Sequence, residues 1–211
     1  MLFRSKENLR ERKNYKEQST NSRLGWLVII GTLPVVIIGL GFKDFIEGAF
    51  TKNLYVISAS LIVLAIILAI AEKTAKFKKE IKDVTIVDAL IVGLAQAVAL
   101  IPGSSRSGTT LTAGLFLGLN REAAARFSFL LSAPAIFASG MLQLYQALDF
   151  LNNQMIFVLT ISTIVSAVSG YFTIDFLLKY LRKNSTFIFV YYRIALGIII
   201  LVLISFNVIK P

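Results

Sequence analysis

An arginine with hydroxyl and glycine neighbours interrupts one of the most apolar stretches of this chain. The segment from Pro102 to Thr110 reads PGSSRSGTT and lies inside the apolar run 89–119. A guanidinium in a hydrocarbon environment is unfavourable by several kcal/mol unless an anion or hydrogen-bonding groups meet it. Arg106 therefore indicates a functional site, and its fork of five donors matches the oxygens of a phosphate. We expect this segment to bind a phosphate group.

The neighbours of Arg106 can supply further contacts. A helix beginning near Ser107 would direct its unpaired N–H groups and the positive end of its dipole at an anion. Hydroxyls add donors, and glycines let the backbone approach a ligand closely. The candidate residues beside the arginine are Gly103, Ser104, Ser105, Ser107, Gly108, Thr109 and Thr110. A helix kink with locally satisfied hydroxyls is the alternative, but a kink does not require a buried cation. The segment also lacks the Gly-Lys-Ser/Thr ending of a nucleotide P-loop.

The composition is that of an all-α polytopic membrane protein. Of 211 residues, 56% are hydrophobic and 16% charged, and the mean hydropathy is +0.74, more apolar than a soluble domain. The net charge of +10 is concentrated in short stretches beside the apolar runs, as topology signals are, so we expect no nucleic-acid partner. Cysteine and histidine are absent. Acid-base chemistry within the chain would therefore use carboxylates or hydroxyls.

Five apolar runs have about the 20 residues that a membrane-spanning helix needs. The predicted spans are 24–42, 54–71, 123–148, 155–178 and 187–208. Residues 1–23 form a basic N-terminal tail, and we interpret 24–211 as a single membrane domain.

A sixth apolar region, 85–119, is too long for one helix and is broken at Pro102-Gly103. Its halves of about 16 and about 12 residues would extend roughly 24 and 18 Å, short of a hydrocarbon core of about 30 Å. The region is either one interrupted span or a re-entrant helix-loop-helix. Backbone that is not helical at this depth must be buried in protein or line a cavity. The break should therefore form a polar pocket.

The distribution of basic residues favours the re-entrant alternative. With the tail in the cytoplasm, a re-entrant 85–119 places Lys73 to Lys82, Arg121 and Lys179 to Lys183 on the cytoplasmic side, as the positive-inside rule requires. A single crossing would invert everything after residue 85. The N-terminus is then predicted to be cytoplasmic and the C-terminus outside.

Three segments resemble the second signature region of the undecaprenyl-diphosphatase family of bacitracin-resistance phosphatases. They are Ala95-Gln96-Ala97, Leu100 to Thr110 and Asn120 to Pro134, and the resemblance extends from about Ser22 to the C-terminus. The family removes one phosphate from undecaprenyl diphosphate in the bacterial inner (plasma) membrane, regenerating the lipid carrier for cell-wall synthesis. Its fold is an inverted repeat with two re-entrant elements. The resemblance therefore implies this lipid substrate, this membrane and a partial inverted-repeat architecture.

The resemblance also assigns residues. Ser105 and Arg106 fall on the family's phosphate-contacting serine and arginine, and Thr110 on the threonine of the motif; Ser104 and Ser107 are additional donors. The family's first signature contains a Ser-Ser-Thr-Gly-His sequence, and its glutamates are thought to hold a divalent cation, Mg²⁺ or Ca²⁺. That signature has no counterpart here, so we expect no metal ligand in this chain, and we expect the first re-entrant element and one span to precede Met1.

Few acidic residues offer other chemistry. Asp88 is expected to cap a helix, Glu122 to start a helix or to orient Arg106 or Arg126, and Asp175 to pair with Lys179 at i,i+4. Three hypotheses follow. The first is a phosphatase. The second is a non-catalytic polyprenyl-phosphate binding or transport protein, because transporters also direct broken helices at anions. The third is a structural subunit in which Arg106 pairs internally. A homo-oligomer is compatible with each.

Overall fold

The computed structural model describes residues 20–42, 46, 48 and 53–210. The described part of the chain is all-α and contains no β-strand. The predicted tail therefore lies almost wholly outside the described residues. The helices are α2 (Thr20–Gly41), α5 (Leu54–Thr74), α6 (Ile86–Val98), α7 (Arg106–Phe116), α8 (Arg121–Ala147), α9 (Asn153–Lys183) and α10 (Phe187–Ser205), with short 3₁₀ turns η3 (Ile81–Asp83) and η4 (Leu148–Phe150).

Five of these helices, α2, α5, α8, α9 and α10, are long and apolar enough to cross a membrane. They coincide with the five predicted spans, and the chain is a multi-pass membrane protein. The largest difference is in α9, which extends beyond the predicted 155–178 in both directions. Asn152 caps its first turn by accepting a hydrogen bond from the N–H of Met155, and its last turn carries Arg182 and Lys183. Hydropathy could not predict these polar ends.

The central region 85–119 returns to the end of the molecule from which it starts. The N–H of Lys79, before α6, donates to the carbonyl of Gly118, after α7 (2.9 Å), and the N–H of Asn120 donates to the carbonyl of Lys79 (2.9 Å). The 13 residues of α6 and the 11 of α7 extend only about 20 and 16 Å. The re-entrant prediction is therefore confirmed.

Helix α6 begins as the sequence indicates. Thr85 and Asp88 form a reciprocal capping box, with the N–H of Thr85 donating to Asp88 at 2.9 Å, and Lys79 forms an ion pair with the same carboxylate at 3.1 Å. The predicted capping role of Asp88 is confirmed. The predicted pair of Asp175 and Lys179 is also present, at 2.6 Å.

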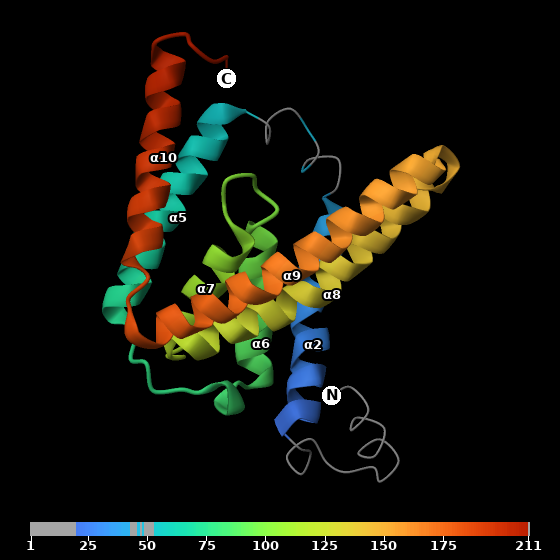
Figure 1. Cartoon of the computed structure of the whole chain (residues 1–211). Helices are drawn as coiled ribbons and strands as arrows, with labels where there is room; N and C mark the ends of the chain where they lie inside the picture. The colour runs from blue at the N-terminus through green and yellow to red at the C-terminus, as the bar shows by residue number, and fades with distance from the viewer. Residues whose placement is uncertain (1–19, 43–45, 47, 49–52, 211) are drawn as a thin grey trace.

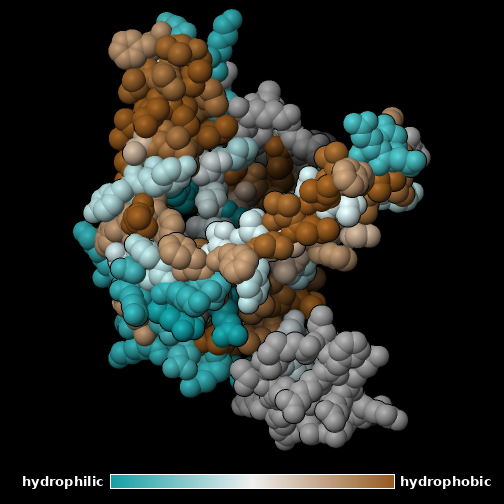
Figure 2. Space-filling view, in the orientation of Figure 1, coloured by the Kyte–Doolittle hydropathy of each residue, from teal (hydrophilic) through white to brown (hydrophobic). Residues whose placement is uncertain are grey.

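The basic connections gather at one end of the molecule. The guanidinium of Arg23 donates to the carbonyls of Lys82 and Val84, both at 2.9 Å. The buried carboxylate of Glu72 accepts from Arg121 at 2.6 Å and from Thr186 at 2.9 Å. Figure 2 shows the hydrophilic residues on this side, below the apolar surface of the helices. As predicted, the basic loops lie at the same end of the molecule.

Glu122 lies in the first turn of α8, as predicted for a helix-start residue, but in the part of the chain that the structure describes it does not orient Arg106 or Arg126. Its carboxylate accepts from Arg182 of α9 at 2.6 Å, and within the described residues it pairs with neither Arg106 nor Arg126. The sequence could not indicate this contact, because the two partners are 60 residues apart and meet only when α8 and α9 form a hairpin. Glu122 fixes the polar base of that hairpin.

Helices α6 and α7 lie at the centre, with α2 on α6 and with α5 and α8 on α7 (Figure 1). Contact between α2 and α6 is closest at Gly31 and Gly93, where a Cβ on Gly93 would overlap the carbonyl of Gly31. Gly114 of α7 packs against Ala124 of α8. Gly118 occupies a left-handed turn after α7 (φ +86°). Small residues therefore set the spacing of the central helices.

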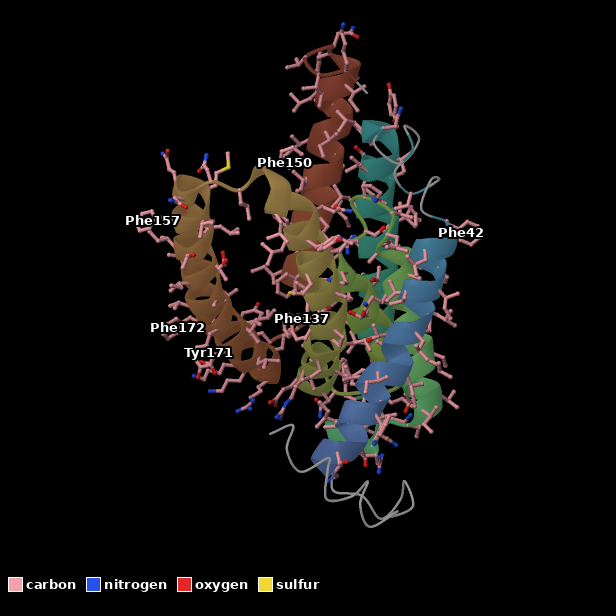
Figure 3. The ribbon with its side chains drawn as sticks, turned by 90° about the vertical axis from the view of Figure 1, so that its right-hand side faces the viewer. Phe42, Phe137, Phe150, Phe157, Tyr171 and Phe172 are labelled. Carbon is pink, nitrogen blue, oxygen red and sulfur yellow. The ribbon has the colours of Figure 1, made fainter. Side chains whose placement is uncertain are left out.

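The hairpin of α8 and α9 projects from this body as an arm (Figures 1 and 3). The most apolar stretch of α9 contains no buried residue. Phe157, Tyr171 and Phe172 point away from the rest of the molecule in Figure 3. In a membrane, such an apolar surface is solvated by lipid tails.

Candidate active site

The loop between α6 and α7 makes its reversal through two residues with left-handed backbone. Gly103 has φ +85° and Ser105 has φ +63°. Glycine adopts this region freely, whereas a serine there is strained by about 1–3 kcal/mol and stays only where its surroundings fix it. Ser105 is also the N-cap of α7, and its Oγ accepts from the N–H of Gly108 at 3.3 Å. The predicted phosphate-contacting serine thus lies at a strained helix start.

Helices α5 and α10 hold the loop from two sides. Ser60 of α5 donates its hydroxyl to the carbonyl of Pro102 at 2.7 Å. A Cβ on Gly103 would overlap Ser60 Oγ, so the loop and α5 are in direct contact. From α10, Arg193 Nη2 donates to the carbonyls of Gly103 at 3.2 Å and Ser104 at 2.9 Å. The loop is therefore rigidly placed.

The loop lies at membrane depth. At about 1.5 Å per residue, Ser60 is roughly 21 Å from the basic end of α5, and Arg193 is about 9 Å from the first residue of α10. Both positions are inside a hydrocarbon core of about 30 Å. In the non-helical segment Ser104 is fully buried and Pro102 and Gly103 are partly buried. The carbonyls of these three residues accept hydrogen bonds from Ser60 and Arg193, as polar backbone groups at this depth require.

Hydroxyls of the first turns of α7 bond within the protein. Thr110 Oγ1 donates to the carbonyl of Arg106 at 2.8 Å and is hydrogen-bonded to Ser128 of α8. Thr109 Oγ1 also contacts the carbonyl of Arg106, at 3.0 Å. Thr110 is fully buried. It therefore lies behind the start of α7 and fixes this turn against α8.

Two arginines flank the start of α7. Arg106 is half-buried, and its guanidinium has no hydrogen bond or ion pair with any residue that the structure describes. Arg193 is only 6% exposed, and its Nε and Nη1 have no partner among the described residues. Nη1 lies over Gly108, where a Cβ would be 2.7 Å away. A second cation thus adjoins the predicted phosphate site.

Sequence reasoning did not single out Arg193. The signal was present, because Arg193 interrupts the apolar run 187–208 and the same penalty for a buried guanidinium applies to it as to Arg106. It lacks a flanking motif of glycines and hydroxyls. Arg193 also contacts residues that are distant in the sequence, because Gly103 precedes it by 90 positions and Ser104 by 89.

A cavity of about 230 Å³ opens beside the start of α7, between α5, α8, α9 and α10. Its polar lining consists of Ser105, Ser107, Ser128, Tyr192 and Arg193, beside Gly108. The remaining walls are apolar: Leu61, Leu68, Leu111, Ala125, Phe129, Leu177, Leu181 and Phe189. The sequence predicted a polar pocket. The cavity is instead mainly apolar with one polar end, because the surrounding spans contribute the apolar faces.

The structure brings only some of the predicted residues to this cavity. Ser105, Ser107 and Gly108 line it, whereas Gly103, Ser104, Arg106 and Thr110 do not. Ser104 is fully buried, and its Oγ has no partner within the described residues, as is also true of the amide of Gln96 in α6. Buried polar groups are normally hydrogen-bonded. Ser104 Oγ and the amide of Gln96 can therefore form a further hydrogen bond.

The family model of the bacitracin resistance protein BacA matches residues 2–199. The chain belongs to the BacA family. Its relatives include proteins named undecaprenyl-diphosphatase. That of Syntrophobacter fumaroxidans is 58% identical over 191 residues, covering 90% of this chain and 68% of the relative. Those of Chloroherpeton thalassium and Chlorobaculum parvum are 50% and 46% identical over 197 and 202 residues, covering 89% and 92% of this chain and 69% and 71% of the relatives.

The divalent cation expected for the BacA family finds no ligand set in the described part of the chain. No three side chains of His, Cys, Asp or Glu are grouped there so as to hold a metal ion. The two buried carboxylates are already engaged, Glu72 with Arg121 and Thr186 and Asp88 with Lys79 and the helix cap. These residues do not fit a metal site.

Proposed function

We propose that this BacA-family protein hydrolyses undecaprenyl diphosphate to undecaprenyl phosphate and inorganic phosphate. The observation that supports the proposal is the start of α7, which lies with Arg106 and with Arg193 of α10 beside a mainly apolar cavity. A lipid diphosphate matches both features of this site, because its phosphates are anionic and its lipid chain is apolar. The names of the relatives give the same substrate. The reaction would return the lipid carrier to cell-wall synthesis and confer resistance to bacitracin.

In this reaction the oxygen of a water molecule bonds to the terminal phosphorus. The bond from that phosphorus to the bridging oxygen breaks, and the bridging oxygen stays with the lipid phosphate. Negative charge develops on the oxygens of the transferred group, and fixed donors that meet it lower the barrier. We assign this role to Arg106, at the first position of α7, with Ser105, Ser107 and the helix N-terminus as further donors to the diphosphate as a whole.

Thr110 takes a positioning role in this scheme. Its hydroxyl bonds to the carbonyl of Arg106 and to Ser128, so it acts on the phosphate through the turn that carries Arg106. Gly103 and Ser104 act similarly, because their carbonyls hold Arg193. Ser105, in contrast, lines the cavity directly.

The membrane setting also enters as a proposal. We place the protein in the bacterial inner membrane with the basic end in the cytoplasm and the end of α10 outside. The charge distribution supports this orientation, because Lys and Arg concentrate on cytoplasmic loops. A homo-oligomer and dependence on a divalent cation stay predictions.

Phosphate release from undecaprenyl diphosphate by the purified full chain, in detergent micelles with and without Mg²⁺ or Ca²⁺, tests the function. We expect inorganic phosphate and undecaprenyl phosphate in equal amounts. Saturable binding of the lipid phosphate with no turnover under any of these conditions would contradict hydrolysis and favour a binding or transport protein.

A further inference from the structure

We propose that Arg193 binds the phosphate that remains on the lipid, while Arg106 serves the phosphate that is released. This inference rests on the proposed function and divides its anion site into two parts. Each part has its own cation: one lines the apolar cavity, and the other lies at the first position of α7 outside the cavity lining.

The protein leaves Arg193 only partly satisfied. Nη2 donates to two backbone carbonyls, but Nε and Nη1 have no partner, and no carboxylate pairs with this guanidinium anywhere in the described ranges. A buried cation with unused donors is unfavourable unless an anion meets it. Because Arg193 is only 6% exposed, water satisfies these donors poorly. An anionic ligand would compensate the charge and accept hydrogen bonds from the unused donors.

The unused donors face a suitable place. Nη1 lies over Gly108 in the first turn of α7, where backbone N–H groups and the helix dipole also favour negative charge. The hydroxyls of Ser105, Ser107 and Ser128 line the same cavity. A phosphate there would meet a guanidinium, a helix start and hydroxyl donors together.

The apolar walls indicate which phosphate this is. Leu61, Leu68, Leu111 and Phe129 line the same cavity as Arg193, and an isoprenoid chain is the part of the substrate that such walls solvate. The phosphate attached to the isoprenoid must lie within one bond of it. Arg193, which borders these walls, is therefore placed for the lipid-side phosphate, and Arg106 for the terminal one.

Binding of a lipid monophosphate separates this inference from hydrolysis. The probes are farnesyl phosphate and farnesol, measured by equilibrium binding to the detergent-solubilised full chain. Wild type should prefer the phosphate over the alcohol. Arg193→Gln should lose about tenfold to a hundredfold in affinity for the phosphate, the range of a charge-assisted hydrogen bond, and keep its affinity for the alcohol. Arg106→Gln should keep most of the preference.

Two further variants guard against misfolding and against a merely structural role. Gly108→Ala adds a Cβ against Nη1 and should displace the guanidinium without removing its charge, so it should also weaken phosphate binding although alanine favours a helix. Arg182→Gln removes an exposed arginine that pairs with Glu122 and should bind as wild type does.

Several results would overturn the assignment. The wild type could show no preference for farnesyl phosphate over farnesol. The Arg193→Gln or Gly108→Ala variant could retain that preference, or Arg106→Gln could abolish it. Equal loss of alcohol and phosphate binding in Arg193→Gln would show that Arg193 only holds the loop. Failure of the wild type to release phosphate from undecaprenyl diphosphate would instead contradict the proposed function, and this binding assay does not depend on that turnover.

Discussion

Arg106 and Arg193 both place a guanidinium at membrane depth, where a charge is unfavourable without a partner. Only Arg106 belongs to a sequence motif that indicates a binding site. Arg106 lies among glycines and hydroxyls that already indicate a phosphate loop. Arg193 lies in a plain apolar run, and only the three-dimensional structure shows that it holds this loop at the carbonyls of Gly103 and Ser104. A sequence gives the residue types at a site. It does not give which distant helix completes it.

The strained backbone of Ser105 gives a prediction at the residue scale. Ser105→Ala should lower the free energy of unfolding by about 1 kcal/mol, because the N-cap bond to Gly108 is lost while the positive φ remains. Ser105→Gly should be at least as stable as wild type, because glycine relieves the strain and is nearly as good an N-cap. Thermal unfolding of the detergent-solubilised variants measures this, and Ser105→Gly falling below Ser105→Ala would contradict it.

At the scale of elements, the re-entrant pair could be predicted but its packing could not. The break at Pro102-Gly103 and the lysine distribution were sufficient to predict that the pair of α6 and α7 starts and ends at the same end of the molecule. The close approach of α2 to α6 at Gly31 and Gly93 was not foreseen. Small residues recur along many spans, and which of them meet depends on the relative shift and rotation of two helices. Packing settles that choice, and local sequence does not encode it.

Gly93→Ala tests the contact between these elements. The added Cβ would overlap the backbone carbonyl of Gly31, and backbone cannot move aside as a flexible side chain can. We expect a loss of more than about 2 kcal/mol in the free energy of unfolding. Gly25→Ala in α2 is the matched control, since a Cβ there meets nothing within 4 Å and alanine favours the helix. Similar stability of the two variants would argue against the observed packing of α2 on α6.

For the whole molecule, charge and hydropathy predicted the five spans and the common side of the basic loops, and the structure links these loops through Glu72, Arg121 and Thr186. The sequence predicted a polar pocket at the loop, but it predicted neither the apolar walls of the cavity beside α7 nor the apolar arm of α8 and α9. Both follow from how the spans assemble. Periodicity within one helix gives no information on the space left between several.

The absence of cysteine from the sequence makes the membrane orientation directly measurable. Single cysteines at Lys78 and Lys210 lie in the basic loop before α6 and after the end of α10, respectively. A membrane-impermeant maleimide added to intact spheroplasts should label Lys210→Cys, and should label Lys78→Cys only after permeabilisation, because basic loops stay in the cytoplasm. Wild type, which has no thiol, is the unlabelled control. The reverse pattern would invert the proposed orientation.

The most direct test of the central claim uses undecaprenyl diphosphate labelled in its terminal phosphate. Wild type should release the label as inorganic phosphate. Arg106→Ala should release it at least about 100-fold more slowly, the usual consequence of removing a donor that stabilises the transition state, and Arg182→Gln, which removes an exposed arginine, should match wild type. No release by wild type, or equal rates for wild type and Arg106→Ala, would contradict the claim that this re-entrant loop is the phosphate site of a lipid diphosphatase.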